Sequence, residues 1–243
     1  MGVVVHGIVD ADSVPALSEA ALGVAAGRPV RCVVSEDLAG LVTDGPDSEV
    51  PPSRANLLAH TRLLEAVAEQ TTVLPMRFGV VVHDDAALRR DYLAARQEEL
   101  RRSLARLRGF VELRLRASYV EDEVVRVVLE GDRKAARLRG RPGMQAKVEL
   151  GERISAGIDA RRERDAQVAL DALAPRAADV AVTPVVGGLD VLVASFLVAS
   201  DRHAAFDTAV DELAGRLAPV ATVELVGPMP PFSFTGGGGL TWD

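Results

Sequence analysis

Residues 72–80 read Thr-Val-Leu-Pro-Met-Arg-Phe-Gly-Val, and this segment limits the folds open to the chain more than any other. Pro75 has no backbone N–H to give to a neighbouring strand, so a strand that holds it lies at a sheet edge or bends there. Gly79 suits a bulge or a close backbone approach. Arg77 stands between two large apolar side chains, and burying its five N–H donors would require partners. The segment holds no nucleophile and no obvious general base, so it points to recognition instead of catalysis.

The repeating order of apolar segments predicts an α+β fold. Strands are expected at residues 3–9, 29–35, 38–43 and 72–82, with a short helix after Asp12 and a longer one over 53–70. This β-α-β-β-α-β order is typical of a ferredoxin-like unit. A second such order follows, with strands and helices over 110–119, 144–173, 177–186, 189–200, 201–217 and 220–226. The sequence therefore predicts two tandem ferredoxin-like domains (βαββαβ), each covering one sheet face with two helices.

The domain boundaries follow from helix signals and turn residues. Asp84 is expected to cap a long helix that ends at Gly109 and joins the two domains. The expected parts are residues 1–83 (N-terminal α+β domain), 84–109 (connecting helix), 110–235 (C-terminal ferredoxin-like domain, with a variable insert over 120–143) and 236–243 (flexible tail).

Composition narrows the range of partners and compartments. The net charge of −7 argues against duplex nucleic acid or an anionic membrane as the main partner. The longest apolar run, over residues 191–199, is far shorter than the ~20 residues that a membrane helix needs. A single cysteine, Cys32, excludes an intramolecular disulfide and is expected as an inert buried thiol. The N-terminus has no signal-peptide pattern, so we expect a cytoplasmic protein.

The usual signatures of catalysis and cofactor binding are missing from the sequence. There is no phosphate loop, no Gly-flanked serine, no HExxH and no cluster of Cys and His, so no metal and no cofactor are expected. His6 and His60 are interpreted as core or helix-face histidines. The basic run over residues 133–141 is either a solvated face or a docking loop for an acidic partner surface. These observations favour a protein that is not an enzyme.

Two motifs resemble a known family. The segments that carry them are residues 60–67 (HTRLLEAV), 69–79 (EQTTVLPMRFG), 195–198 (SFLV), 206 and 227–234 (GPMPPFSF). Their order and spacing resemble the gas vesicle protein F/L family over nearly the whole chain. The chain departs from the common family pattern at Met229 and Phe232, where members often have Trp and Tyr.

The resemblance implies a role in gas vesicle assembly. Members take part in forming the shell and are thought to bind the small hydrophobic major shell protein, and other accessory proteins are further candidate partners. A protein with an apolar groove or an open sheet edge can cover such a subunit before assembly. The alternative from another class is a small-molecule-binding regulator or enzyme on ferredoxin-like domains, because the fold alone does not decide function.

The candidate partner-binding residues come from the two motifs. They are Leu74, Met76, Arg77, Phe78, Phe232 and Phe234. The alternative is that both motifs are structural, one as a bent edge strand and the other as a tail that locks the fold. For Arg77, a buried ion pair and a partner contact remain equally open. We also expect residues 227–234 to pack on the folded body, because prolines lower the entropy lost on ordering and two Phe rings can bury a large apolar area.

Overall fold

The computed structural model describes residues 2–46, 50–185 and 187–235. The chain divides into two compact units, and the first is built from two separate stretches, Met1–Glu112 and Pro228–Asp243. The second unit is Leu113–Gly227. Each unit combines helices with an antiparallel sheet, so the predicted α+β class is confirmed.

The first unit is centred on the sheet β4-β5-β1-β6, with β7 also pairing with β1. Its strands are β1(Gly2–Asp10), β4(Arg31–Ser35), β5(Leu38–Gly45), β6(Leu74–Pro75) and β7(Val81–Val82), beside a small hairpin of β2(Val24–Ala25) and β3(Arg28–Pro29). Its helices are a 3-10 turn over Ala11–Ala16, α1(Glu19–Leu22), α2(Arg54–Ala68), α3(Asp85–Ala87), a π-helix over Leu88–Ala94, α4(Gln97–Leu107) and a 3-10 turn over Phe232–Phe234.

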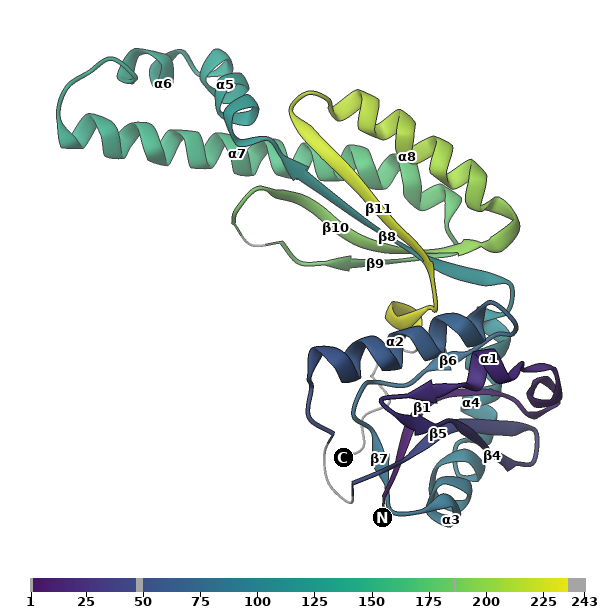
Figure 1. Ribbon diagram of the computed structural model, residues 1–243. Helices are drawn as coiled ribbons and strands as arrows, with labels where there is room; N and C mark the ends of the chain where they lie inside the picture. The colour runs from purple at the N-terminus through teal and green to yellow at the C-terminus, as the bar shows by residue number, and fades with distance from the viewer. Residues whose placement is uncertain (1, 47–49, 186, 236–243) are drawn as a thin grey trace. The chain divides into compact units, whose positions relative to one another are not determined.

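Helices cover both faces of this first sheet, where we expected only one face to be covered (Figure 1). A Cβ on Gly7 of β1 would lie 2.8 Å from Leu64 of α2, whereas a Cβ on Gly40 of β5 would lie 3.0 Å from Leu88 on the opposite side. The physical reason is in the sequence of β1, which is apolar at almost every position and is buried on both faces. Cys32, on the edge strand β4, is half-buried instead of fully buried.

The strand expected over residues 72–82 is split in two, and its first half is an edge strand, as Pro75 predicts. Pro75 pairs with Gly7 of β1, and Met76 N–H donates to the His6 carbonyl at 2.9 Å. The chain leaves the ladder after Met76 and turns through Gly79, whose φ of 89° favours glycine. It rejoins β1 at β7.

The expected single helix over 84–109 is three helical pieces that belong to the first unit. Asp84 does cap its start, since its carboxylate accepts from the Ala87 N–H at 2.7 Å. Leu88 and Leu93 are both fully buried although they are five residues apart, a spacing that a regular α-helix does not place on one side. The π-turn brings both onto the buried face, and the helix restarts at Gln97.

The second unit is centred on the sheet β11-β8-β10-β9. Its strands are β8(Phe110–Tyr119), β9(Asp179–Thr183), β10(Asp190–Ala199) and β11(Ala221–Met229). Its helices are α5(Glu121–Gly131), α6(Arg133–Leu138), α7(Met144–Leu173) and α8(His203–Leu217), with 3-10 turns over Ala174–Arg176 and Ser200–Arg202. β11 extends past residue 226, where the sequence predicts its end, and runs through Pro228. It can do so because β11 is an edge strand and needs no outward N–H there.

One face of this second sheet is covered by α7 and α8 (Figure 1). Leu113 and Leu115 of β8 point into a core with Leu173 of α7 and Phe206 of α8. Arg114 and Arg116 alternate with them and are exposed. This alternation is the half-buried pattern that the sequence of β8 predicts.

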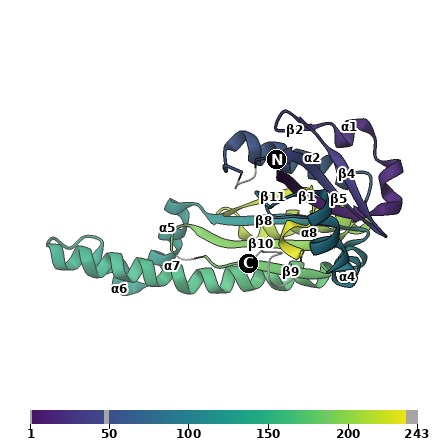
Figure 2. The same cartoon turned by 90° about the horizontal axis from the view of Figure 1, so that it is seen from below.

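Helix α7 is unbroken and runs through Gly151 and Gly157. Its N-terminal half carries α5 and α6, which occupy the region expected as an irregular insert (Figure 2). A Cβ on Gly157 would lie 2.5 Å from Val128 Cγ1 of α5, so this glycine permits a close approach of the two helices. By contrast, no atom lies within 4 Å of a Cβ on Gly151.

Candidate functional site

A chain of four polar groups crosses the interior of the first unit below the Met76–Phe78 turn. His6 Nε2 lies 3.0 Å from Thr43 Oγ1, and His6 Nδ1 lies 3.0 Å from His60 Nδ1. His60 Nε2 lies 3.1 Å from the Met76 carbonyl oxygen. Strands β1 and β5 and helix α2 position these groups, and all three side chains are buried.

The hydrogen-bond chemistry allows one proton order along this chain. A carbonyl can only accept, so His60 Nε2–H donates to Met76 and His60 Nδ1 is left as an acceptor. His6 Nδ1–H then donates to His60, and His6 Nε2 accepts from the Thr43 hydroxyl. Both imidazoles are neutral in this arrangement.

Burial keeps the two imidazoles neutral. Burial, together with a smaller effect of the charge that His60 would carry, lowers the pKa of His6 from 6.5 to about 4. Burial also lowers the pKa of His60, and the hydrogen bond to Met76 offsets part of that effect. These hydrogen bonds therefore hold the backbone of the Met76–Phe78 turn in place at neutral pH. Both histidines thus have a structural role.

A pocket of about 190 Å³ opens beside this polar chain, within the first unit. Its lining is mostly apolar and includes Val4, Ala25, Val50, Ala59 and Phe78, with His6, His60, Thr43, Asn56 and Arg28 among its polar groups. The Phe78 ring meets His60 edge to face, with the ring centroids 5.6 Å apart. This pocket has room for an apolar side chain and a polar atom.

The predicted residues of the first motif separate into buried and accessible ones. Leu74 and Met76 are fully buried in this chain's own core, and the Tyr92 hydroxyl donates to Met76 Sδ at 3.5 Å. Arg77 is exposed, and Phe78 is half-buried on the pocket wall. Arg77 forms no ion pair with any residue that the structure describes, which removes the buried ion pair as its explanation.

Helix α2 adds two apolar side chains that sequence reasoning did not single out as a site. Leu57 is 42% exposed and Leu58 is 43% exposed, directly after Asn56 of the pocket lining. Both are exposed because the first turns of α2 extend past the core, and the buried residues of this helix begin at His60. Nothing in the sequence distinguishes this pair from Leu63 and Leu64 of the same helix, which are also adjacent but are both buried.

The second motif packs against the first unit, as expected for residues up to Thr235. Phe234 is buried, and Phe232 packs against the core between α2 and the sheet. Ser233 donates from its N–H and its hydroxyl to the carboxylate of Glu112, at 2.8 and 2.7 Å, and Arg106 donates to the Phe234 carbonyl. Sequence reasoning missed Glu112 as the anchor. The expectation for residues 236–243 lies outside the described residues.

The described residues contain neither a candidate metal site nor a candidate membrane span. Within those residues, no three His, Cys, Asp or Glu side chains are grouped so that they could hold a metal ion. No helix among them combines the length and apolar character needed to cross a bilayer.

Together these features define a class of protein: two α+β units, with an apolar pocket beside a structural histidine chain and a C-terminal segment that returns to the first unit. The family model described as "Gas vesicle synthesis protein GvpL/GvpF" matches residues 2–236. The chain therefore belongs to the gas vesicle protein F/L family, and the resemblance seen in its motifs is confirmed.

Relatives and solved structures agree with this assignment. Gas vesicle protein F of Streptomyces sp. (strain CB03234) is 36% identical over 216 residues, covering 85% of this chain and 88% of the relative. Gas vesicle protein L of the same organism is 29% identical over 251 residues, covering 90% and 88%. The crystal structure of GvpF from Anabaena sp. PCC7120 matches with a TM-score of 0.81 at 20% identity, covering 97% of this chain and 98% of that one, and so supports the fold.

Proposed function

We propose that this chain is a non-enzymatic, cytoplasmic gas vesicle accessory protein that binds the hydrophobic shell protein and supports nucleation and assembly of the shell. The observation that carries the proposal is the apolar surface of the first unit, which we call the α2 surface. We define it as the exposed Leu57 and Leu58 of α2 together with Phe78 and the pocket that Phe78 lines. Family membership supports the accessory role. The chemistry of the surface supports the partner.

The α2 surface suits a strongly apolar subunit. Its two leucines are each more than 40% exposed, so a partner that covers them gains part of the about 1.5–3 kcal/mol that full burial of a large apolar side chain contributes. The adjoining pocket can take one further side chain of the partner, with the half-buried Phe78 as its wall. The exposed Arg77 directly precedes Phe78 in the sequence, and it can bind a carbonyl or a carboxylate of the partner at the rim of the pocket.

The six predicted site residues therefore receive three different roles in the proposal. Arg77 and Phe78 contact the partner. Leu74 and Met76 hold the turn in place from beneath, because both are fully buried. Phe232 and Phe234 fasten the C-terminal segment to the same unit, which rigidifies the core under α2.

The ferredoxin-like description of both units is part of this proposal. It is supported by the strand orders β4-β5-β1-β6 and β11-β8-β10-β9. When the four strands in each of these orders are numbered along the chain, the first sheet has the order two-three-one-four. The second sheet has the same order when it is read from its β9 edge. This is the strand order of a split β-α-β unit. No observation on the described residues favours the alternative of a small-molecule enzyme or regulator.

The experiment that tests the proposal is a pull-down of purified shell protein with two matched variants. Leu57→Gln/Leu58→Gln keeps good helix formers on α2, and we expect it to reduce capture at least about tenfold. Val182→Thr/Val226→Thr, at positions 51% and 57% exposed in the second unit, is the control and should capture as wild type does. Equal capture by both variants would remove the α2 surface from the proposal.

A further inference from the structure

The second unit carries a strongly charged projection that the proposed function does not use. We call it the basic arm and define it as residues 132–153, which comprise α6, the turn at Pro142 and Gly143, and the first part of α7. α6 buries Ala135 and Leu138, and it packs along α7. Figure 2 shows α6 beside the free end of α7.

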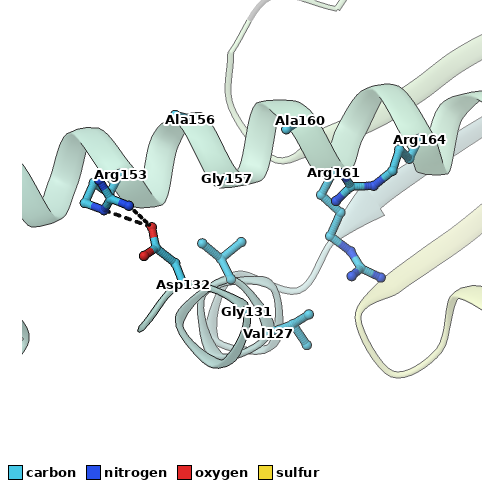
Figure 3. Close-up of a pocket in the computed structure, with 10 residues that line it drawn as sticks. Val127, Gly131, Asp132, Arg153, Ala156, Gly157, Ala160, Arg161 and Arg164 are labelled. Carbon is cyan, nitrogen blue, oxygen red and sulfur yellow. Dashed lines mark hydrogen bonds and ion pairs between the residues drawn. The ribbon is translucent and has the colours of Figure 1, made fainter. Parts of the chain in front are cut away.

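Two ion pairs fix α6 against α7. Asp132 binds Arg153 at 2.7 Å (Figure 3). Asp132 also caps α6 by accepting from the Lys134 and Ala135 N–H groups. Lys134 Nζ lies 2.6 Å from a carboxylate oxygen of Glu149. The arm is therefore a built, ordered element and its outward side chains have a fixed scaffold.

The remaining charge of the arm is unbalanced. Residues 132–153 hold seven Lys or Arg and three Asp or Glu, a net charge of +4, in a chain whose total is −7, so the rest of the chain carries −11. After the two ion pairs, five cations remain that are exposed and form no ion pair with any described residue: Arg133, Arg137, Arg139, Arg141 and Lys147. Like charges held together in this way repel each other, which an acidic partner would relieve.

Apolar side chains stand within this charged surface. Met144 is 77% exposed and Val148 is 51% exposed, one helical turn apart on α7, and Lys147 lies between them in sequence. A purely solvated charged face does not need these two side chains. Their position gives the arm an apolar strip bordered by cations.

We propose that the basic arm is a docking surface for an acidic amphipathic helix of a partner protein. The apolar side of that helix packs on Met144 and Val148, and its carboxylates meet the five free cations. A nucleic acid is a poorer occupant because its phosphates would meet the net −11 of the remaining chain and would leave the apolar strip uncovered. The surface lies in the second unit and is independent of the α2 surface.

The test uses the full chain and a designed, fluorescently labelled peptide of about five helical turns, with Leu at i and i+4 and Glu at the other exposed positions. Binding is measured by anisotropy at low salt and at high salt. We expect Arg133→Glu/Arg139→Glu/Arg141→Glu to weaken binding at least about tenfold, and Met144→Ser to weaken it about threefold. High salt should weaken binding to the wild type.

The matched control is Arg54→Glu/Arg62→Glu/Arg202→Glu, which changes the net charge by the same amount at exposed positions outside the arm. It should bind as wild type does. A second arm variant with Gln at the same three positions replaces the Glu variant if circular dichroism shows that the latter is unfolded. An equal loss in the arm variant and the control would overturn the proposal, because net charge alone would then explain binding.

Other occupants are tested with the same proteins. Vesicles of phosphatidylcholine and phosphatidylserine at three to one, and a duplex of about two helical turns of DNA, serve as polyanion probes. The proposal fails if either probe binds through the arm while the acidic peptide does not bind. It also fails if sedimentation shows that wild type self-associates through the arm, since the occupant would then be a second copy of the chain. Failure of the Leu57/Leu58 test leaves this result unaffected, because that variant alters a different unit.

Discussion

At the scale of single residues, the histidines show how burial decides a role that the sequence left open. His6 and His60 lie 54 positions apart, and no local spacing indicates that their rings meet at 3.0 Å. Register between β1 and β5 and the packing of α2 create that contact. The sequence supplied the expectation of core histidines, and the structure adds their shared proton order.

The buried histidines make the free energy of unfolding depend on pH. The unfolded chain binds a proton on His6 near pH 6.5, whereas the folded protein does so only near pH 4. The unfolded state therefore holds more protons in this window, so the free energy of unfolding falls as the pH drops from 6.5 towards 4, by about 3 kcal/mol at most. We expect urea denaturation between pH 7 and 4 to show this loss.

His6→Asn should reduce this pH dependence, whatever its effect on stability at pH 7. His83→Gln is the control, because His83 is exposed and should leave the dependence unchanged. A slope that is the same in wild type and in His6→Asn would show that other groups cause it.

The anchor of the second motif is also a residue-scale feature. Ser233→Ala removes the hydroxyl that donates to Glu112 at 2.7 Å, inside a site where Glu112 is only 2% exposed. We expect a loss of about 1–3 kcal/mol of stability, since a buried carboxylate loses a charge-assisted hydrogen bond. Ser155→Ala on the exposed side of α7 should cost nothing. Equal melting temperatures for the two variants would contradict the anchoring role.

At the scale of elements, the sequence predicted structural features that depend on a single residue. It missed features that depend on packing between elements. Pro75 alone predicts an edge strand, because its missing N–H is a property of the residue. The break in the helix over 84–109 arises because Leu88 and Leu93 both cover one face of the sheet. The sequence alone does not show that these two residues share a buried face. The sequence does not predict helix α6, because Ala135 and Leu138 form a buried face only when they pack against α7.

Packing of α5 on α7 gives an element-scale prediction. Gly157→Ala would place a Cβ 2.5 Å from Val128 Cγ1, so we expect about 1–3 kcal/mol of destabilisation in chemical denaturation. Gly151→Ala on the same helix meets nothing within 4 Å and should stabilise by up to about 1 kcal/mol. Val128→Ala should relieve the cost of Gly157→Ala in the double variant, and an unrelieved cost would argue against this contact.

At the scale of the whole molecule, the chain leaves the first unit at Glu112 and returns to it at Pro228. This return was predictable in part, since prolines and two Phe residues indicate a segment that packs in an extended form. The sequence did not reveal which unit receives it, because the receiving groups, Glu112 and Arg106, are ordinary charged residues of a strand and a helix.

Truncation measures the contribution of the returning segment. Ending the chain after Met229 keeps β11 but removes the buried Phe234, the half-buried Phe232 and the Ser233 contacts. We expect a loss of about 3–5 kcal/mol, from the burial of large apolar side chains and a buried hydrogen bond. Ending it after Thr235 should leave the melting temperature unchanged. Two truncations that melt like wild type would mean that the segment contributes no stability.

The central claim is that the α2 surface contacts the shell protein, and photo-crosslinking tests it most directly. A photoreactive phenylalanine analogue is placed at Leu58 of α2 or, as the control, at Val226 of β11, which is also exposed. The complex is irradiated, and adducts are identified by mass spectrometry. If the α2 surface contacts the shell protein, position 58 should form an adduct with the shell protein and position 226 should form none. An adduct from position 226 with none from position 58 would contradict it.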